Sequence, residues 1–166
     1  TFLGSLWMKE IFVLLIRNGE LQQAYPLAII ILMGYNFRPM YLAVVNLLTY
    51  HEHTDKLWRI SGVAGIGNIV LNFILVPLYG FEMAAYTTFA SLMYMGYSGY
   101  FLKECKQRIL VPYYPMWWML ATVVLLGVVY NLRELELLAK AAVTGIGLLM
   151  GTVAMLRYRK TLFVEA

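Results

Sequence analysis

Charged residues are scarce in this sequence, and their scarcity excludes an ordinary soluble domain. Asp, Glu, Lys and Arg make up 13% of the 166 residues, whereas soluble domains carry about 25%. Hydrophobic residues make up 61%, and a soluble protein of this length could not bury so much apolar surface in one core. The composition predicts an integral membrane protein. The 13 Lys and Arg against 9 Asp and Glu then reflect loop orientation rather than binding to nucleic acid.

Cysteine and histidine are also rare, which removes several kinds of site. The single Cys105 excludes an internal disulfide bond and a cysteine-based metal site. The two histidines flank an acid in His51-Glu52-His53, which is weak evidence for zinc without a further ligand cluster. The sequence has no glycine-rich phosphate loop, catalytic triad or paired carboxylates at a useful spacing. We therefore expect no enzyme activity, no metal and no cofactor.

Long apolar runs are what the sequence has in abundance, and they predict an all-α, multi-pass transmembrane helical bundle. Residues 1–18 read as the end of a partial N-terminal helix, because Lys9 and Glu10 interrupt a run that is shorter than the ~20 apolar residues needed to span. The turn Pro77-Leu78-Tyr79-Gly80 joins two later spans into an antiparallel hairpin. About five full spans are expected, at residues 25–50, 60–78, 81–102, 115–131 and 137–156.

The basic residues between the spans predict how the chain is oriented. One side collects eight of them, namely Lys56, Arg59, Lys103, Lys106, Arg108, Arg157, Arg159 and Lys160. The other side has three, namely Arg17, Arg133 and Lys140. The positive-inside rule places the richer side in the cytoplasm. The turn at Tyr79-Gly80 is then external, and the C-terminus is cytoplasmic.

The hairpin and the loop before it carry a pattern that resembles a transporter family. The pattern reads Thr54-Asp55-Lys56, then Asn68-x-x-Leu71-Asn72-x-x-Leu75-x-Pro77-x-Tyr79-Gly80, then Ala84-Ala85-x-x-Thr88. It resembles the C-terminal lobe of the polysaccharide (O-antigen type) flippases, in the multidrug/oligosaccharidyl-lipid/polysaccharide exporter superfamily. The resemblance covers about residues 8–105. It departs from the family pattern at Met83, where Gly is usual, and at Thr87, where Ala is usual.

This resemblance implies a fold, a substrate and a location. Family members have two pseudo-symmetric six-helix lobes around a central cavity, and they rock between inward-open and outward-open states. Residues 1–108 would be second-lobe helices, and residues 109–166 would be two extra C-terminal transmembrane helices. The implied partners are a lipid-linked glycan substrate, membrane lipids and the missing N-terminal half of the same chain. The implied location is a bacterial or archaeal cell (plasma) membrane.

Arg38 is the sharpest candidate for a substrate contact. It lies near the middle of the span 25–50, where a lipid-exposed Arg costs about 2.5–3.5 kcal/mol on insertion scales. Such a residue normally faces a bundle interior or a watery cavity, where it could hold the diphosphate of a lipid-linked glycan. The structural alternatives are hydrogen bonds to backbone carbonyls and snorkelling of the side chain toward the interface. Asn36 shares the neighbourhood of Arg38 and is a second candidate.

Three further polar residues belong to the hairpin. Asn68 and Asn72 are four residues apart and therefore share one helix face; they are candidates for substrate binding, with hydrogen bonds between helices as the more ordinary role. Glu82 follows the external turn. It could take part in coupling to an ion, or it could cap the helix that begins there.

The predicted function is that of a flippase, which moves a lipid-linked oligosaccharide or polysaccharide precursor across the cytoplasmic membrane by alternating access. An ion-coupled multidrug antiporter of the same superfamily is one alternative, and it would need acidic residues inside the lobe. A membrane-embedded glycan-processing enzyme is another, and His51-Glu52-His53 would be its acid and histidine cluster. A scaffold subunit that does not transport is a third.

Overall fold

The computed structural model describes residues 1–102, residue 105 and residues 114–162, and these residues are helical without any strand. The expectation of an all-α chain is confirmed for them. In chain order the helices are α1 (Phe2–Leu6), α2 (Met8–Leu15), α3 (Gly19–Gln22), α4 (Tyr25–Gly34), η1 (Tyr35–Phe37), α5 (Arg38–Tyr50), η2 (Thr54–Lys56), α6 (Leu57–Tyr79), α7 (Met83–Phe101), α9 (Pro115–Leu132) and α10 (Leu137–Leu162). The expected basic loop with Lys103, Lys106 and Arg108 lies outside the described residues, as does the expected boundary between residues 108 and 109.

Three helical stretches are long and apolar enough to cross a membrane, judged by length and composition. They are Gly19–Tyr50, Thr54–Tyr79 and Leu137–Arg157, and Met116–Leu132 is a shorter apolar helix. This is consistent with a helical membrane protein. It falls short of the expected five spans, because Met116–Leu132 is shorter than the others and α7 is not among the candidate spans.

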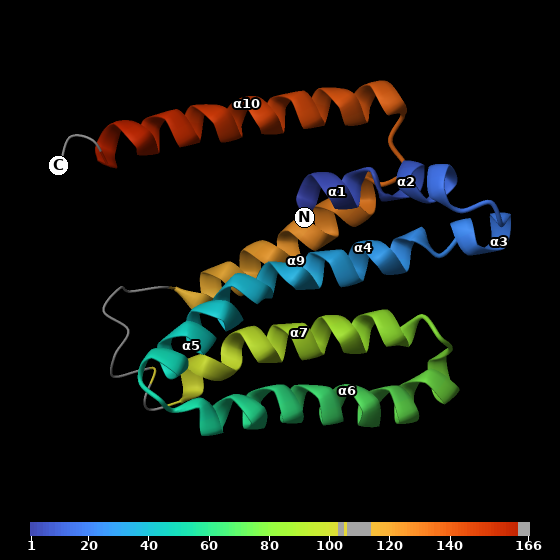
Figure 1. Ribbon diagram of the computed structural model, residues 1–166. Helices are drawn as coiled ribbons and strands as arrows, with labels where there is room; N and C mark the ends of the chain where they lie inside the picture. The colour runs from blue at the N-terminus through green and yellow to red at the C-terminus, as the bar shows by residue number, and fades with distance from the viewer. Residues whose placement is uncertain (103–104, 106–113, 163–166) are drawn as a thin grey trace.

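The long helices lie side by side, and α10 extends away from them (Figure 1). Helices α6 and α7 form the antiparallel hairpin that the sequence predicts, and α7 also packs on α4 and α5. Gly80 closes the hairpin with a φ of +91°, a conformation that side chains other than glycine rarely adopt. Helix α9 packs on α1 and α4. Helix α7 is therefore the central element of the hairpin side of the bundle.

Two glycines let the chain around η1 approach α7 closely. A Cβ atom built on Gly99 would lie 2.0 Å from Cγ2 of Val44, and one built on Gly96 would lie 2.9 Å from the carbonyl oxygen of Phe37. Phe37 is fully buried, and its ring contacts that of Phe89 edge to face, with centroids 5.6 Å apart. Small residues at a helix crossing permit this kind of packing in membrane bundles.

The bundle has two ends, and basic residues lie at both of them. We call the right-hand end in Figure 1 the turn end, because it holds the α6–α7 turn together with α3 and the α9–α10 connection. The opposite end, with η2 and the α5–α6 connection, is the loop end. Arg17, Arg133 and Lys140 belong to the turn end. Lys56 and Arg59 belong to the loop end.

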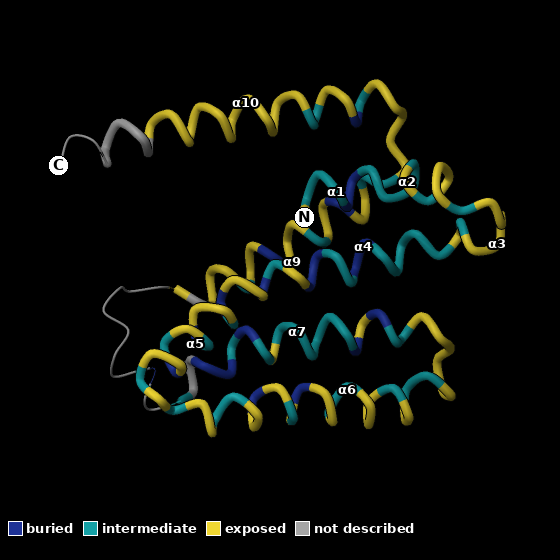
Figure 2. The backbone as a smooth tube through the Cα atoms, in the orientation of Figure 1, coloured by how far each residue is buried: buried dark blue, intermediate teal, exposed yellow. Residues whose placement is uncertain are grey.

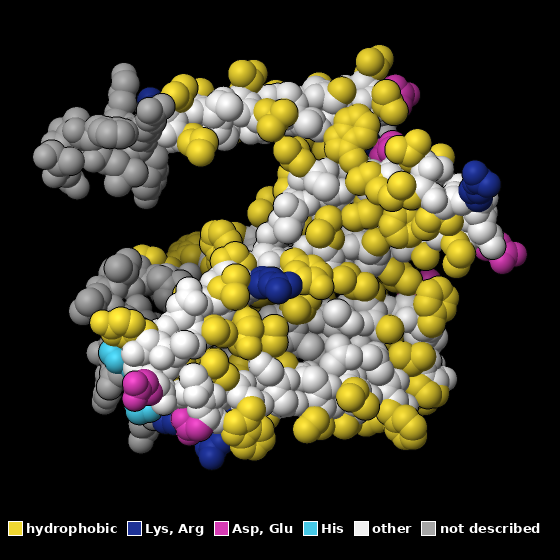
Figure 3. All heavy atoms as spheres, in the orientation of Figure 1, with side chains coloured by type: hydrophobic (Ala, Val, Ile, Leu, Met, Phe, Trp, Pro, Cys, Tyr) yellow, Lys and Arg dark blue, Asp and Glu magenta, His cyan; other side chains and the backbone are white. Residues whose placement is uncertain are grey.

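Much of the chain along α6, α9 and α10 is exposed (Figure 2), and large apolar side chains lie across the face shown in Figure 3. In the most apolar windows of the stretches that contain α6 and α10, only 11% and 6% of the residues are buried. Phe73 on α6 is 83% exposed and Leu138 on α10 is 81% exposed. Soluble proteins rarely leave such continuous apolar surface in water.

Candidate functional site

Arg38 lies at a break in the first long helical stretch. Helix α4 ends at Gly34, η1 makes one 3₁₀ turn, and α5 begins at Arg38 with Pro39 in its first turn. The break has a local cause, because Pro39 lacks an N–H group and its ring would clash with the carbonyl of Tyr35 in a continuous α-helix. Arg38 is exposed, and its guanidinium carbon lies 5.8 Å from the centroid of the Tyr35 ring. The side chain thus lies on the outer surface of the described bundle.

Asn36 belongs to a different face of the chain from Arg38. Its Oδ1 accepts a hydrogen bond from the hydroxyl of Thr1, and its Nδ2 lies 3.8 Å from the sulfur of Met33. Its backbone carbonyl accepts a hydrogen bond of 3.2 Å from the indole of Trp118. Residues two apart on a helical segment do not face each other. Asn36 and Arg38 are therefore close in sequence, as expected, but their side chains have different partners and point to different faces.

Asn68 and Asn72 form a polar network with two threonines across the α6–α7 hairpin. Nδ2 of Asn72 donates to Oδ1 of Asn68 over 2.6 Å, and the hydroxyl of Thr87 donates to Oδ1 of Asn72 over 2.6 Å. Nδ2 of Asn68 lies 3.4 Å from the hydroxyl of Thr88. The network gives the two asparagines the interhelical role that the sequence left open. The network depends on the hydroxyl of Thr87, because an Ala at that position could not bond to Asn72.

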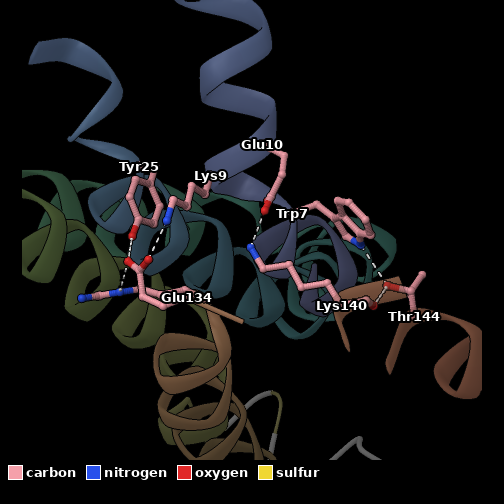
Figure 4. Close-up of polar contacts among 8 residues, drawn as sticks. Trp7, Lys9, Glu10, Tyr25, Glu134, Lys140 and Thr144 are labelled. Atoms are coloured by element: carbon pink, nitrogen blue, oxygen red, sulfur yellow. Dashed lines mark hydrogen bonds and ion pairs between the residues drawn. The ribbon is translucent and has the colours of Figure 1, made fainter. Parts of the chain in front are cut away.

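The shortest ion pairs among the described residues are at the turn end (Figure 4), and sequence reasoning did not find them. The ammonium of Lys9 lies 2.6 Å from a carboxylate oxygen of Glu134, and that of Lys140 lies 2.6 Å from Glu10. Tyr25 donates its hydroxyl to the other oxygen of Glu134. These contacts tie α2 to the start of α10 and to the connection before it.

A signal for these pairs is present in the sequence. Lys9, Glu10 and Lys140 all interrupt apolar runs, and charged residues inside such runs usually pair with one another. The partners are 125 and 130 residues apart, so only the tertiary fold could identify which pairs form. The indole of Trp7 adds a neutral contact, a hydrogen bond of 2.9 Å to the hydroxyl of Thr144.

Glu134 is held in its ionised form by this cluster. The hydrogen bond from Lys9, followed by the one from Tyr25, lowers the pKa of the Glu134 carboxyl from 4.5 to about 2. Its side chain is 55% exposed, so solvent screens the interaction. The carboxylate therefore remains charged throughout the physiological pH range.

Glu82 lines a cavity at the turn end, which we call the turn-end cavity. Its volume is ≈ 500 Å³, and its polar wall includes Glu20, Glu82 and Arg133 together with Tyr86 and Tyr130. Glu82 occupies the N-cap position of α7, the place the sequence suggested, without a side-chain hydrogen bond to the helix. One nitrogen of Arg133, Nη1, is buried and has no hydrogen-bond partner.

The candidate residues do not converge on one site within the described part of the chain. Arg38 lies at the helix break, the Asn68–Asn72 network lies inside the α6–α7 hairpin, and Glu82 lies at the turn end. Comparison of the chain with protein-family models, with curated proteins and with solved structures finds no match. The substrate and coupling roles of these residues remain predictions.

Proposed function

We propose that the protein is a membrane transporter of the flippase type, which moves a lipid-linked oligosaccharide or polysaccharide precursor across a bacterial or archaeal cell membrane. In this proposal about five spans, including α7 and α9, belong to the second lobe and the two extra helices of a two-lobe transporter. Alternating access moves the polar head group while the lipid tail stays in the bilayer. No covalent bond is made or broken.

The observation that carries the proposal is the position of Arg38. It lies in the middle third of the 32-residue stretch Gly19–Tyr50, and its side chain is exposed on the outside of the described bundle. A guanidinium facing lipid at that depth would cost about 2.5–3.5 kcal/mol on insertion scales. The face that presents Arg38 is therefore better suited to a water-filled cavity, and in the proposal this cavity lies between the two lobes.

The helix break suits the same use. An unwound segment at membrane depth is tolerated where it lines a water-filled cavity or is buried in protein. A diphosphate moving through such a cavity needs hydrogen-bond donors that replace its water shell, and a guanidinium offers several in a fixed plane. Tyr35, beside the guanidinium, supplies an aromatic face next to the same position.

The count of basic residues along the sequence, eight on one side against three on the other, supports the proposed orientation. With the loop end in the cytoplasm, Lys56 and Arg59 obey the positive-inside rule. The C-terminus is then cytoplasmic, and the α6–α7 turn is external. Helix α6 runs outward in this arrangement.

Transport by vesicles that contain the protein encoded by the whole gene tests the proposal. The probe is a fluorescent lipid-linked oligosaccharide diphosphate, and its arrival in the opposite leaflet is followed with time. We expect Arg38→Gln to lower the initial rate at least about tenfold, because it removes a charge-assisted hydrogen bond. Arg38→Lys should keep part of the rate, because it retains the charge without the planar donor set.

Arg17→Gln is the matched control, since Arg17 is also exposed but lies outside the candidate span. It should transport at the normal rate. Normal rates for both Arg38 variants would show that Arg38 does not bind the diphosphate. A complete lack of transport by the unaltered protein would reject the flippase function itself.

A further inference from the structure

The direction in which Arg38 points depends on the turn that precedes it. Successive residues of a 3₁₀ turn are about 120° apart, so Asn36, Phe37 and Arg38 point to three different sides of η1. Asn36 is half-buried, Phe37 is buried and Arg38 is exposed. The backbone N–H of Arg38 donates to the carbonyl of Tyr35, which would bond to residue 39 in an α-helix, but Pro39 has no N–H. A rotation of this turn about its axis would therefore move Arg38 away from the outer surface.

Helix α7 holds one side of the turn by apolar contacts. The ring of Phe37 contacts those of Phe89 and Tyr97, with centroids 5.6 Å and 6.0 Å away. Gly96 lets the backbone of Phe37 come close, since a Cβ at that position would lie 2.9 Å from the Phe37 carbonyl oxygen. This packing sets the distance between η1 and α7. Apolar attraction is not directional, so a second fixed point is needed to set the rotation of the turn.

The second fixed point is a hydrogen bond from α9. The indole Nε1 of Trp118 donates to the backbone carbonyl of Asn36 over 3.2 Å. A hydrogen bond is directional, and a side chain that bonds into a helix's carbonyl ladder is a recognised cause of a bend. Further along α9, Val129 packs in one cluster with Ile29 and Met33 of α4. Helix α9 therefore contacts both α4 and the turn that follows it.

We propose that Trp118 is a positioning residue for Arg38. Its hydrogen bond to the carbonyl of Asn36 fixes the rotation of η1, so that the guanidinium stays on the outer surface beside Tyr35. The inference rests on the proposed function, in which Arg38 binds the diphosphate. It gives α9, the first of the two extra helices, a part in substrate binding. Trp118 acts through the turn and does not itself contact the substrate.

Hydrogen exchange of the protein encoded by the whole gene, in lipid nanodiscs, tests whether Trp118 holds the turn. Trp118→Phe keeps an aromatic ring and removes the N–H donor. We expect the amides of residues 36–38 to exchange about fivefold faster in this variant, because the turn opens more easily without the bond. Trp117→Phe is the matched control, since Trp117 is 69% exposed and lies about 100° further round the helix. It should leave exchange unchanged, and unchanged exchange in Trp118→Phe would overturn the proposal.

Transport in the same vesicle assay tests whether the turn acts through Arg38. Trp118→Phe should lower the initial rate about fivefold. The double variant with Arg38→Gln should be no slower than Arg38→Gln alone, because the rotation of the turn no longer positions a guanidinium. A Trp118 that only stabilised the fold would lower both rates by the same factor. Normal transport by Trp118→Phe, or an equal loss in both backgrounds, would overturn this proposal alone, whereas no transport by the unaltered protein would overturn both proposals.

Discussion

Lys140 is a completely buried cation whose ammonium is bound by a single carboxylate. Its side chain is 0% exposed and lies 2.6 Å from Glu10, which is 29% exposed. The second oxygen of Glu10 has no hydrogen-bond partner. Breaking a buried ion pair by removing one partner leaves the other charge uncompensated. The pair therefore makes the contact between α2 and α10 depend on both residues together.

Lys140→Met should destabilise the protein by about 3–5 kcal/mol, because Glu10 then remains in a largely dry environment without its cation. Unfolding of the purified protein in mixed micelles measures the change. The double variant with Glu10→Gln should recover a large part of the loss, since no isolated charge remains. Arg17→Met, which removes an exposed cation at the same end, should have little effect. A single Lys140→Met variant as stable as the unaltered protein would contradict the pairing.

Glu134 should make stability depend on pH in the acid range. Its pKa is about 2 in the folded protein against 4.5 for the free group, so the unfolded chain takes up the proton first as the pH falls. The stabilisation is complete above about pH 4.5 and is lost as the pH falls toward about 2. The difference in Tm between the unaltered protein and Glu134→Gln should therefore be constant above pH 5 and disappear near pH 2. A difference that grew on acidification would show the opposite shift.

The sequence singled out residues with a possible function more easily than it indicated which side chains contact one another. The rarity of charge inside apolar runs drew attention to Arg38, and the same argument applies to Lys140. Which acid pairs with Lys140 could not be read from the sequence, because Glu10 is 130 residues away. The bonding of Thr87 to Asn72 was equally hidden, because it depends on the register of the α6–α7 hairpin. The contact of Arg38 or of either asparagine with a substrate remains a prediction.

At the scale of elements, the packing of α7 against η1 and α5 requires glycine at two positions of α7, Gly96 and Gly99. A Cβ on Gly99 would lie 2.0 Å from Val44, and one on Gly96 would lie 2.9 Å from the carbonyl oxygen of Phe37. Real carbon atoms do not approach this closely. Either substitution must therefore move α7 away from its neighbour.

Gly99→Ala and Gly96→Ala should each lower the free energy of unfolding by about 1–3 kcal/mol, the usual cost of overpacking. Val44→Ala should recover part of the loss in Gly99→Ala, because it removes the two nearest methyl groups. Gly65→Ala is the matched control on α6, where nothing lies within 4 Å of the added carbon. It should be neutral or slightly stabilising. Equal stability of all three alanine variants would show that the helices do not cross at these glycines.

The helices themselves were predictable with small errors. The expected span 60–78 is α6 (Leu57–Tyr79), and the expected span 115–131 is α9 (Pro115–Leu132), because long apolar runs bounded by Pro, Gly and charges mark their limits. The exception is the span 25–50, which contains the 3₁₀ turn η1. Pro39 in the sequence indicates that break. The close approach of the chain around η1 to α7 depends on glycines in a distant part of the sequence, and it could not be predicted.

At the scale of the whole molecule, the bundle has an apolar exterior and charged groups at its two ends, and this arrangement suits the proposed function in a membrane. The apolar exteriors of α6 and α10 are suited to lipid or to further protein. The charged groups described at the turn end and at the loop end mark the two levels at which the helices would leave the bilayer. The composition predicts a location in the membrane. The two ends arise because successive long helices run in opposite directions.

Labelling with a membrane-impermeant maleimide in intact cells tests the spanning of α6 and its direction most directly. In a Cys105→Ser background, Tyr79→Cys reports on the turn end and Thr54→Cys reports on the loop end, because both positions are exposed. We predict labelling of Tyr79→Cys from outside, and of Thr54→Cys only after permeabilisation. Labelling of both from outside, or of neither before permeabilisation, would contradict a membrane-spanning α6 that runs outward.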